Sequence, residues 1–140
     1  MSRLLSALIA ATISISTAHA TGVAGEWWTP GFNARVRIAP CGDAWCGQIV
    51  WAWDDQPQGI ADGRPLVGQT VISGMKSAAQ GTWTGGRLYN PEDGRSFQGS
   101  MTLKGAHNLV LEGCMLLFCR KQVWRRHEPG VCPPSSKSVE

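Results

Sequence analysis

The chain has 140 residues, with 13 basic and 10 acidic side chains and a formal net charge of +3. This charge is small and dispersed, which argues against nucleic acid as a partner. The 17 glycines and 7 tryptophans, together with the lack of any stretch of helical periodicity, favour an all-β domain.

The first 20 residues have the pattern of a secretory signal peptide. Arg3 precedes an uncharged, weakly apolar stretch, and Ala18-His19-Ala20 supplies the small residues that signal peptidase reads. A membrane anchor is the alternative, but the apolar stretch is shorter than the roughly 20 residues that span a bilayer. We therefore expect cleavage after Ala20, a periplasmic or secreted protein, and no membrane insertion after cleavage.

The remaining chain alternates apolar and polar residues with the period of two that is typical of β-strands. Eight strands are expected, over residues 25–29, 33–39, 46–53, 69–75, 82–89, 95–103, 108–114 and 119–126. Turn residues separate them, as in "YNPEDGRSF", where Pro91 and Gly94 suit a tight reversal. Closure into a barrel would remove the two unpaired edges of an open sheet. The sequence thus predicts an eight-stranded antiparallel up-and-down barrel over residues 21–127, followed by a disordered tail over residues 128–140.

Five cysteines follow the predicted signal peptide, and four of them form two pairs of equal spacing, "CGDAWC" and "CMLLFC". Each pair flanks a predicted reversal, so in an oxidising compartment we expect the disulfides Cys41–Cys46 and Cys114–Cys119. A four-cysteine zinc site and a crossed pairing, such as Cys41 with Cys114, are the alternatives. Cys132 is left over, either free or bridged to another molecule.

No arrangement of side chains indicates catalysis. His107 falls in a predicted turn and His127 begins the tail, which argues against a metal cluster or a histidine-based nucleophilic site. The aspartates of residues 54–62 lack the spacing of a calcium loop. We therefore expect no catalytic residue, no metal and no cofactor; an enzyme with an unfamiliar carboxylate site is the alternative.

The feature of the sequence that does indicate a function is a set of large, mostly aromatic side chains. Large side chains on neighbouring strands indicate either a filled core or the wall of a ligand cavity; they are Trp51, Trp53, Trp83, Tyr89, Phe97, Met101 and Trp124. By strand parity Arg87 shares a face with Trp83 and Tyr89, where it would meet the polar group of a ligand.

Several segments together resemble a secreted bacterial family, DUF2147, which is a domain of unknown function. They are "GEWWTP", "ARVRIAPCGDAWCGQIVW", "RPLVG", "WTGGRLYNPEDGRSFQGSMTL" and "EGCMLLFCRKQVWRR". The resemblance spans residues 25–126 and implies a lipocalin-like (calycin-like) barrel without an established activity. Gly25-x-Trp27 is similar to the Gly-x-Trp of lipocalins, which implies that Trp27 plugs one end of the barrel beneath Arg126. Trp45 departs from the family, which more typically has leucine there.

These features predict a non-enzymatic, exported protein that binds a small apolar or aromatic ligand inside the barrel. The alternative is an envelope protein-interaction module that uses Trp45 and the hairpin tips, without an internal ligand. No oligomeric state is predicted.

Overall fold

The computed structural model describes residues 22–132, so the predicted signal peptide and residues 133–140 of the predicted tail lie outside the described residues. Eight strands and one short 3-10 helix, η1, make up the fold. Their bounds are β1 (Gly25–Trp28), η1 (Pro30–Phe32), β2 (Ala34–Cys41), β3 (Ala44–Ala52), β4 (Thr70–Ser77), β5 (Thr82–Asn90), β6 (Arg95–Lys104), β7 (Asn108–Met115) and β8 (Phe118–Arg126). Within this part of the chain no helix is long and apolar enough to cross a membrane.

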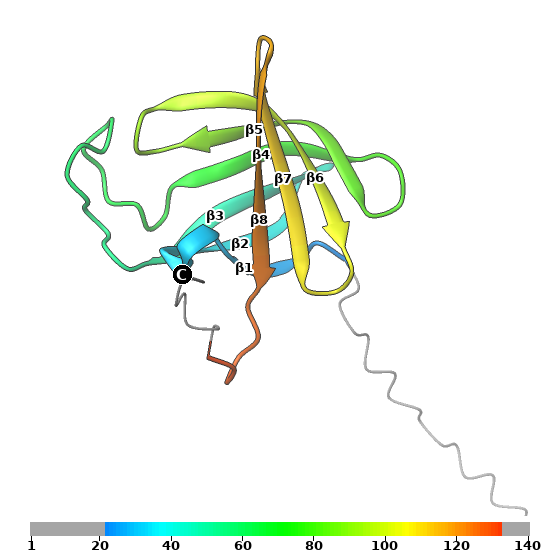
Figure 1. The fold of residues 1–140 in the computed structure, drawn as a ribbon, viewed down its shortest axis with the longest axis horizontal. Helices are drawn as coiled ribbons and strands as arrows, with labels where there is room; N and C mark the ends of the chain where they lie inside the picture. Colours follow the sequence, from blue (N-terminus) through cyan, green and yellow to red (C-terminus); the bar gives the residue numbers. More distant parts are fainter. Residues whose placement is uncertain (1–21, 133–140) are drawn as a thin grey trace, which may run out of the picture.

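The strands form a closed antiparallel barrel (Figure 1). Each strand pairs with its neighbours in sequence, and β1 also pairs with β8. The prediction of an eight-stranded up-and-down barrel is therefore confirmed. Its strand bounds also hold to within two residues, because turn residues mark the ends of the strands in the sequence.

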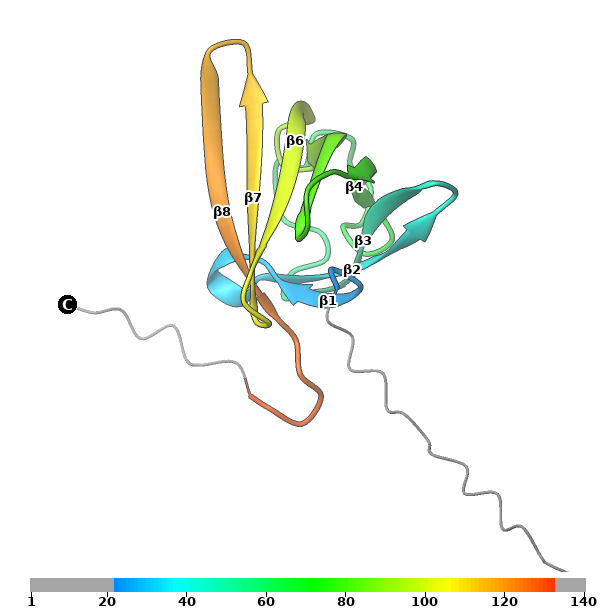
Figure 2. The ribbon, with the colours of Figure 1, turned by 90° about the vertical axis from the view of Figure 1, so that its right-hand side faces the viewer.

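The seam that closes the barrel is short. Only Trp27 and Trp28 of β1 pair with β8, opposite Arg126 and Arg125. Beyond this seam β7 and β8 continue as a long hairpin, which stands away from the rest of the barrel in both views (Figure 1 and Figure 2). The far turn of this hairpin is consequently surrounded by solvent.

The barrel interior is filled by apolar side chains. In β2, Val36 and Ile38 are 1% exposed, while the intervening Arg37 points to solvent, as the alternation of the sequence predicts. The other members of this core are Val23, Trp27, Ile49, Leu66, Val71, Ile72, Met75, Trp83, Met101, Leu109, Leu111 and Trp124.

Register shifts occur in the β2–β3, β3–β4 and β5–β6 pairings. The shifts in β3 and β5 reverse the faces of side chains that the sequence assigned to a cavity. In β3, Ile49 pairs with Val36 but Trp51 pairs with Arg35, so Val50 is an additional residue. In β5, Trp83 pairs with Met101 but Gly86 pairs with Gly99. Gly85 takes up the additional residue there with a φ of 75°, a conformation that glycine adopts without strain. Residues after each bulge therefore face the side opposite to the one that simple parity predicts.

Both predicted disulfides are present. Cys41–Cys46 and Cys114–Cys119 each close a hairpin, with Cα–Cα distances of 5.8 and 4.0 Å. Cys132 is a free, exposed thiol. The prediction of the pairing is confirmed, and neither the crossed pairing nor the four-cysteine zinc site is formed.

Candidate functional site

The side chains predicted to line a cavity fall into two groups. Trp83, Met101 and Trp124 belong to the packed core, where they are 8, 0 and 6% exposed. Phe97 is half-buried on the same face, with its Cβ against the backbone of Gly113. These four residues face inward, as the sequence predicts for their strands.

The other four residues do not face the interior. The bulge in β3 places Trp51 opposite Arg35 on the outer face, and Trp53 is 81% exposed. The bulge at Gly85 turns Arg87 to solvent, so the prediction that it shares a face with Trp83 is wrong. Tyr89 lines a separate hollow. In each strand, one additional residue accounts for the reversal.

Around Met75 the interior has no room for a ligand. A Cβ added at Gly99 would lie 2.7 Å from the Met75 side chain and 2.6 Å from that of Leu88. A Cβ at Gly47 would lie 2.9 Å from the side chain of Ile72. These distances are well below van der Waals contact, so core side chains pack directly on bare backbone. At these positions the barrel is filled by its own residues.

A cavity of about 180 Å³ lies instead outside the core, where the segment after β8 passes β1 and η1. Trp28 of β1 and Phe32 of η1 form its aromatic side, and their ring centroids are 5.9 Å apart. Arg125 and Arg126 of β8 also line it. The remaining lining residues are His107, Glu128, Val131 and Cys132. We call this cavity the Trp28 pocket.

The Trp28 pocket is held in place by a cluster of aromatic contacts. Trp28 meets Phe32, Trp51 and His127 edge to face, the latter two at centroid distances of 5.5 and 5.4 Å. The guanidinium of Arg35 lies 5.3 Å from the centre of the Trp28 ring, within range of a cation–π interaction. Side chains from several strands therefore fix the orientation of one indole ring.

Charged groups support this cluster from the neighbouring strands. Glu26 forms an ion pair with Arg35 at 2.6 Å and accepts a hydrogen bond from Arg37 Nη2 at 2.7 Å. Partial burial raises the pKa of Glu26, but the hydrogen bond from Arg37 and the positive charges of Arg35 and Arg37 outweigh it, so that the pKa is lowered overall. Glu26 is thus ionised at neutral pH and holds Arg35 over Trp28.

Three of the charged or ionisable groups in the Trp28 pocket, His107, Glu128 and Arg126, already have partners. His107 Nδ1 lies 2.9 Å from a carboxylate oxygen of Glu128. Arg126 donates to three backbone carbonyls, while Arg125 is exposed and makes no ion pair among residues 22–132. Burial lowers the pKa of Arg126, and the charge of Glu128 partly offsets this. Arg125 is thus the cation of this pocket that is available to a ligand.

A second hollow, of about 590 Å³, runs along the outside of the barrel beside Tyr89. Its other lining residues come from the 53–69 connection and the start of β4; they are Arg64, Pro65, Val67, Gly68, Gln69 and Thr70. Only Tyr89 contributes an aromatic side chain. Its charged side chain, Arg64, is already paired with Asp62 at 2.7 Å.

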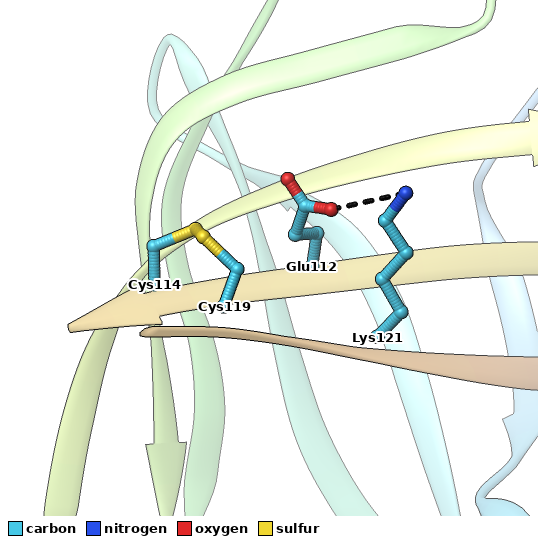
Figure 3. The surroundings of a disulfide bond; sticks show 4 residues. All are labelled: Glu112, Cys114, Cys119 and Lys121. Carbon is cyan, nitrogen blue, oxygen red and sulfur yellow. Dashed lines mark ion pairs between the residues drawn. A yellow bond between two sulfur atoms is a disulfide. The ribbon is translucent and has the colours of Figure 1, made fainter. Parts of the chain in front are cut away.

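One cluster has the composition of a metal site, namely Glu112, Cys114 and Cys119 (Figure 3). The two sulfur atoms are bonded to each other, and the carboxylate of Glu112 pairs with Lys121 at 3.2 Å. A disulfide sulfur has no thiolate charge to offer a metal ion. The cluster is therefore the closing element of a hairpin.

The family model described as "Uncharacterized protein conserved in bacteria (DUF2147)" matches residues 25–126, from the start of β1 to the end of β8. The chain belongs to the DUF2147 family. The match covers every strand of the barrel and ends at Arg126, so the family is defined by the barrel as a whole.

A solved structure supports the same fold for this DUF2147 protein. It is protein HP1028 from Helicobacter pylori, described as belonging to the lipocalin family, with a TM-score of 0.64 and 14% sequence identity. The alignment covers 78% of this chain and 85% of that one. At this identity the likeness shows the lipocalin-like fold alone. No curated protein matches the chain.

Sequence reasoning missed the residues of the Trp28 pocket. Adjacent residues of a strand face opposite sides, so in "GEWW" an inward Trp27 requires an outward Trp28. That signal was available in the sequence. The contacts of Trp28 with Phe32 and His127 could not be predicted from the sequence, because they depend on where η1 and the segment after β8 lie.

Proposed function

We propose that this DUF2147 protein binds a small aromatic or apolar ligand with an anionic group in the Trp28 pocket. The observation that carries the proposal is the pairing of an aromatic wall, Trp28 and Phe32, with the exposed cation Arg125 around one cavity. Such a pocket offers apolar contact for the body of a ligand and a charge that fixes its orientation.

The size of the pocket limits the ligand. At about 180 Å³ it is close to the cavity of about 150 Å³ that is known to accommodate benzene in another protein. We therefore infer a ligand, or a ligand group, with a single ring. This differs from the prediction of a ligand within the barrel, where core side chains pack against Gly47 and Gly99.

We further propose that the protein acts by binding rather than catalysis, and outside the cytoplasm. The aromatic wall and the exposed Arg125 are groups that hold a ligand by apolar contact and charge, which is the observation that favours binding. Two disulfides are compatible with an oxidising compartment. Trp45, which the interaction hypothesis named beside the hairpin tips, is half-buried and packs edge-on against Trp83 at 6.5 Å.

Isothermal titration calorimetry with benzenesulfonate, a single-ring aromatic sulfonate, tests the site. We expect Trp28→Leu and Arg125→Gln each to weaken binding about tenfold, which corresponds to about 1.4 kcal/mol. Trp53→Leu is the matched control, because Trp53 is exposed and does not line the pocket. Cooperative urea unfolding of each variant would show that the titration is made on a folded protein.

The same titration distinguishes the pocket from the barrel interior. If Phe97→Ala weakens binding while Trp28→Leu and Arg125→Gln do not, the ligand site lies in the barrel and the proposal is wrong. Native mass spectrometry of protein purified from its own host complements the titration. A ligand that copurifies with the wild type but not with Trp28→Leu would support the pocket.

A further inference from the structure

The turn between β7 and β8 exposes four consecutive apolar side chains. Leu116 and Leu117 are each 96% exposed, Phe118 is 82% exposed and Met115 is 37% exposed. We call residues 115–118 the apolar tip. In both ribbon views the tip stands clear of the other loops (Figure 1 and Figure 2). Contiguous exposed apolar surface of this kind marks an interaction site in soluble proteins.

The residues of the apolar tip are not those that the turn itself favours. Met115 pairs with Phe118, so Leu116 and Leu117 form a two-residue turn. Leu116 has a φ of 54°, in the left-handed region where glycine or asparagine is the usual choice. The Cys114–Cys119 disulfide closes the hairpin directly below. The hairpin is thus held by a covalent bond while its turn carries leucines, which neither core packing nor turn geometry requires.

Positive charge lies immediately behind the apolar tip. Arg120 and Lys121 follow Cys119 on β8. Lys121 pairs with Glu112, whereas Arg120 is exposed and has no carboxylate within ion-pair distance in the described part of the chain. The hairpin therefore presents an apolar end followed by an uncompensated cation. This order matches a lipid surface, with an apolar region beneath anionic headgroups.

We propose that the apolar tip inserts into the interface of an anionic membrane, with Arg120 at the level of the lipid phosphates. The tip is convex, and a fluid interface can surround such a shape without a preformed complementary groove. Met115 pairs with Phe118, which satisfies backbone polar groups at the base of the turn. The disulfide below holds the hairpin closed before it inserts. The contact is peripheral and involves no spanning segment. It departs from the sequence prediction of no membrane insertion after signal cleavage.

The apolar tip is separate from the ligand site proposed above. β8 begins at the tip with Phe118 and ends at the Trp28 pocket with Arg126. At about 3.3 Å per residue the strand holds the two sites about 25 Å apart. Membrane contact at the tip therefore leaves the pocket accessible, and the two proposals fail or hold independently.

Flotation with lipid vesicles tests this proposal on the exported protein with both disulfides formed. We expect wild type to float with vesicles of phosphatidylcholine and phosphatidylglycerol, and to float less with phosphatidylcholine alone. The double variant Leu116→Ser/Leu117→Ser should lose at least about tenfold in binding, because both side chains are removed from the apolar contact. Arg120→Gln should reduce binding to the anionic vesicles and its sensitivity to salt.

Trp53→Ser is the matched control, since it removes an exposed apolar side chain outside the hairpin and should float like wild type. Urea unfolding of the double variant should match wild type, because the leucines contribute nothing to the core. Flotation of the double variant at the level of wild type would overturn the proposal. The proposal would also be overturned if wild type bound neither kind of vesicle and the two leucines were instead required for self-association or for binding a protein partner.

Discussion

The guanidinium of Arg126 lies over the indole ring of Trp27, with its Cζ 4.2 Å from the ring centroid. Trp27 is fully buried and donates from Nε1 to the carbonyl oxygen of Val23 at 2.9 Å. Arg126 donates to the carbonyl oxygens of Gly22, Ala24 and Ala106 at 2.7, 3.0 and 2.7 Å. One side chain thus ties the segment before β1 and the β6–β7 turn to the end of β8, and covers one end of the barrel.

Arg126→Ala is expected to lower the free energy of unfolding by roughly 1–3 kcal/mol. The substitution removes the cation–π contact and leaves three carbonyl oxygens without their donor. Urea unfolding followed by tryptophan fluorescence measures the change directly.

The adjacent arginine provides the control. Arg125 is exposed on the opposite face of β8, so Arg125→Ala should stay within about 0.5 kcal/mol of wild type. The two residues are identical in chemistry and differ only in the strand face that they occupy. A larger loss for Arg125→Ala would mean that the register of β8 is shifted by one residue.

Gly99→Ala should destabilise the barrel by about 1–3 kcal/mol, the range for overpacking a filled core. The new methyl group would meet the side chains of Leu88 and Met75 at 2.6 and 2.7 Å. Gly22→Ala is the control, because a Cβ there meets nothing within 4 Å and its φ is not positive. If Gly99→Ala unfolds at the same urea concentration as wild type, the interior has free space and a ligand inside the barrel becomes tenable again.

The sequence was sufficient to predict the strands and their order in the barrel. Glycine, proline or asparagine at the reversals other than the Leu116-Leu117 turn, with alternation between them, left one closed antiparallel arrangement as the simplest solution. The disulfides followed from the same reversals, since a tight turn brings two flanking cysteines together. These features depend on residues close in the chain, which is why they could be predicted.

The faces of side chains beyond the bulges could not be predicted in the same way. In β5 the Gly85-Gly86 doublet is a recognisable bulge signal, and it would have placed Arg87 outside. In β3 the segment "IVWAW" carries no such signal, and the outward position of Trp51 follows only from its pairing with Arg35. The Trp28 pocket combines residues from both ends of the chain, so its shape depends on barrel closure.

The cysteines make a prediction for chemical labelling. Iodoacetamide should modify only Cys132 in the native, unreduced protein, because the other four cysteines are in disulfides. After unfolding and reduction all five cysteines should be modified. Peptide mapping of the unreduced protein should recover Cys41 linked to Cys46 and Cys114 linked to Cys119. Recovery of a crossed peptide, or labelling of Cys114 before reduction, would contradict the pairing.

The pH dependence of stability should contain a contribution from Glu26. Its pKa in the folded protein lies below the ordinary value of 4.5. The ionised carboxylate therefore stabilises the fold at neutral pH, and this stabilisation is lost as the pH falls below 4.5 through the folded pKa. For a pair at the protein surface the contribution is about 0.5–1 kcal/mol.

Glu26→Gln should accordingly lower the free energy of unfolding by this amount at pH 7. The difference from wild type should shrink towards zero below pH 4.5, because both proteins then carry a neutral side chain at this position. Glu92→Gln, in the β5–β6 turn, is the control and should change stability by less than about 0.5 kcal/mol at pH 7. Urea unfolding at a series of pH values measures all three proteins. A difference between Glu26→Gln and wild type that is as large in acid as at pH 7 would show that Glu26 acts through packing, and not through its charge on Arg35 and Arg37.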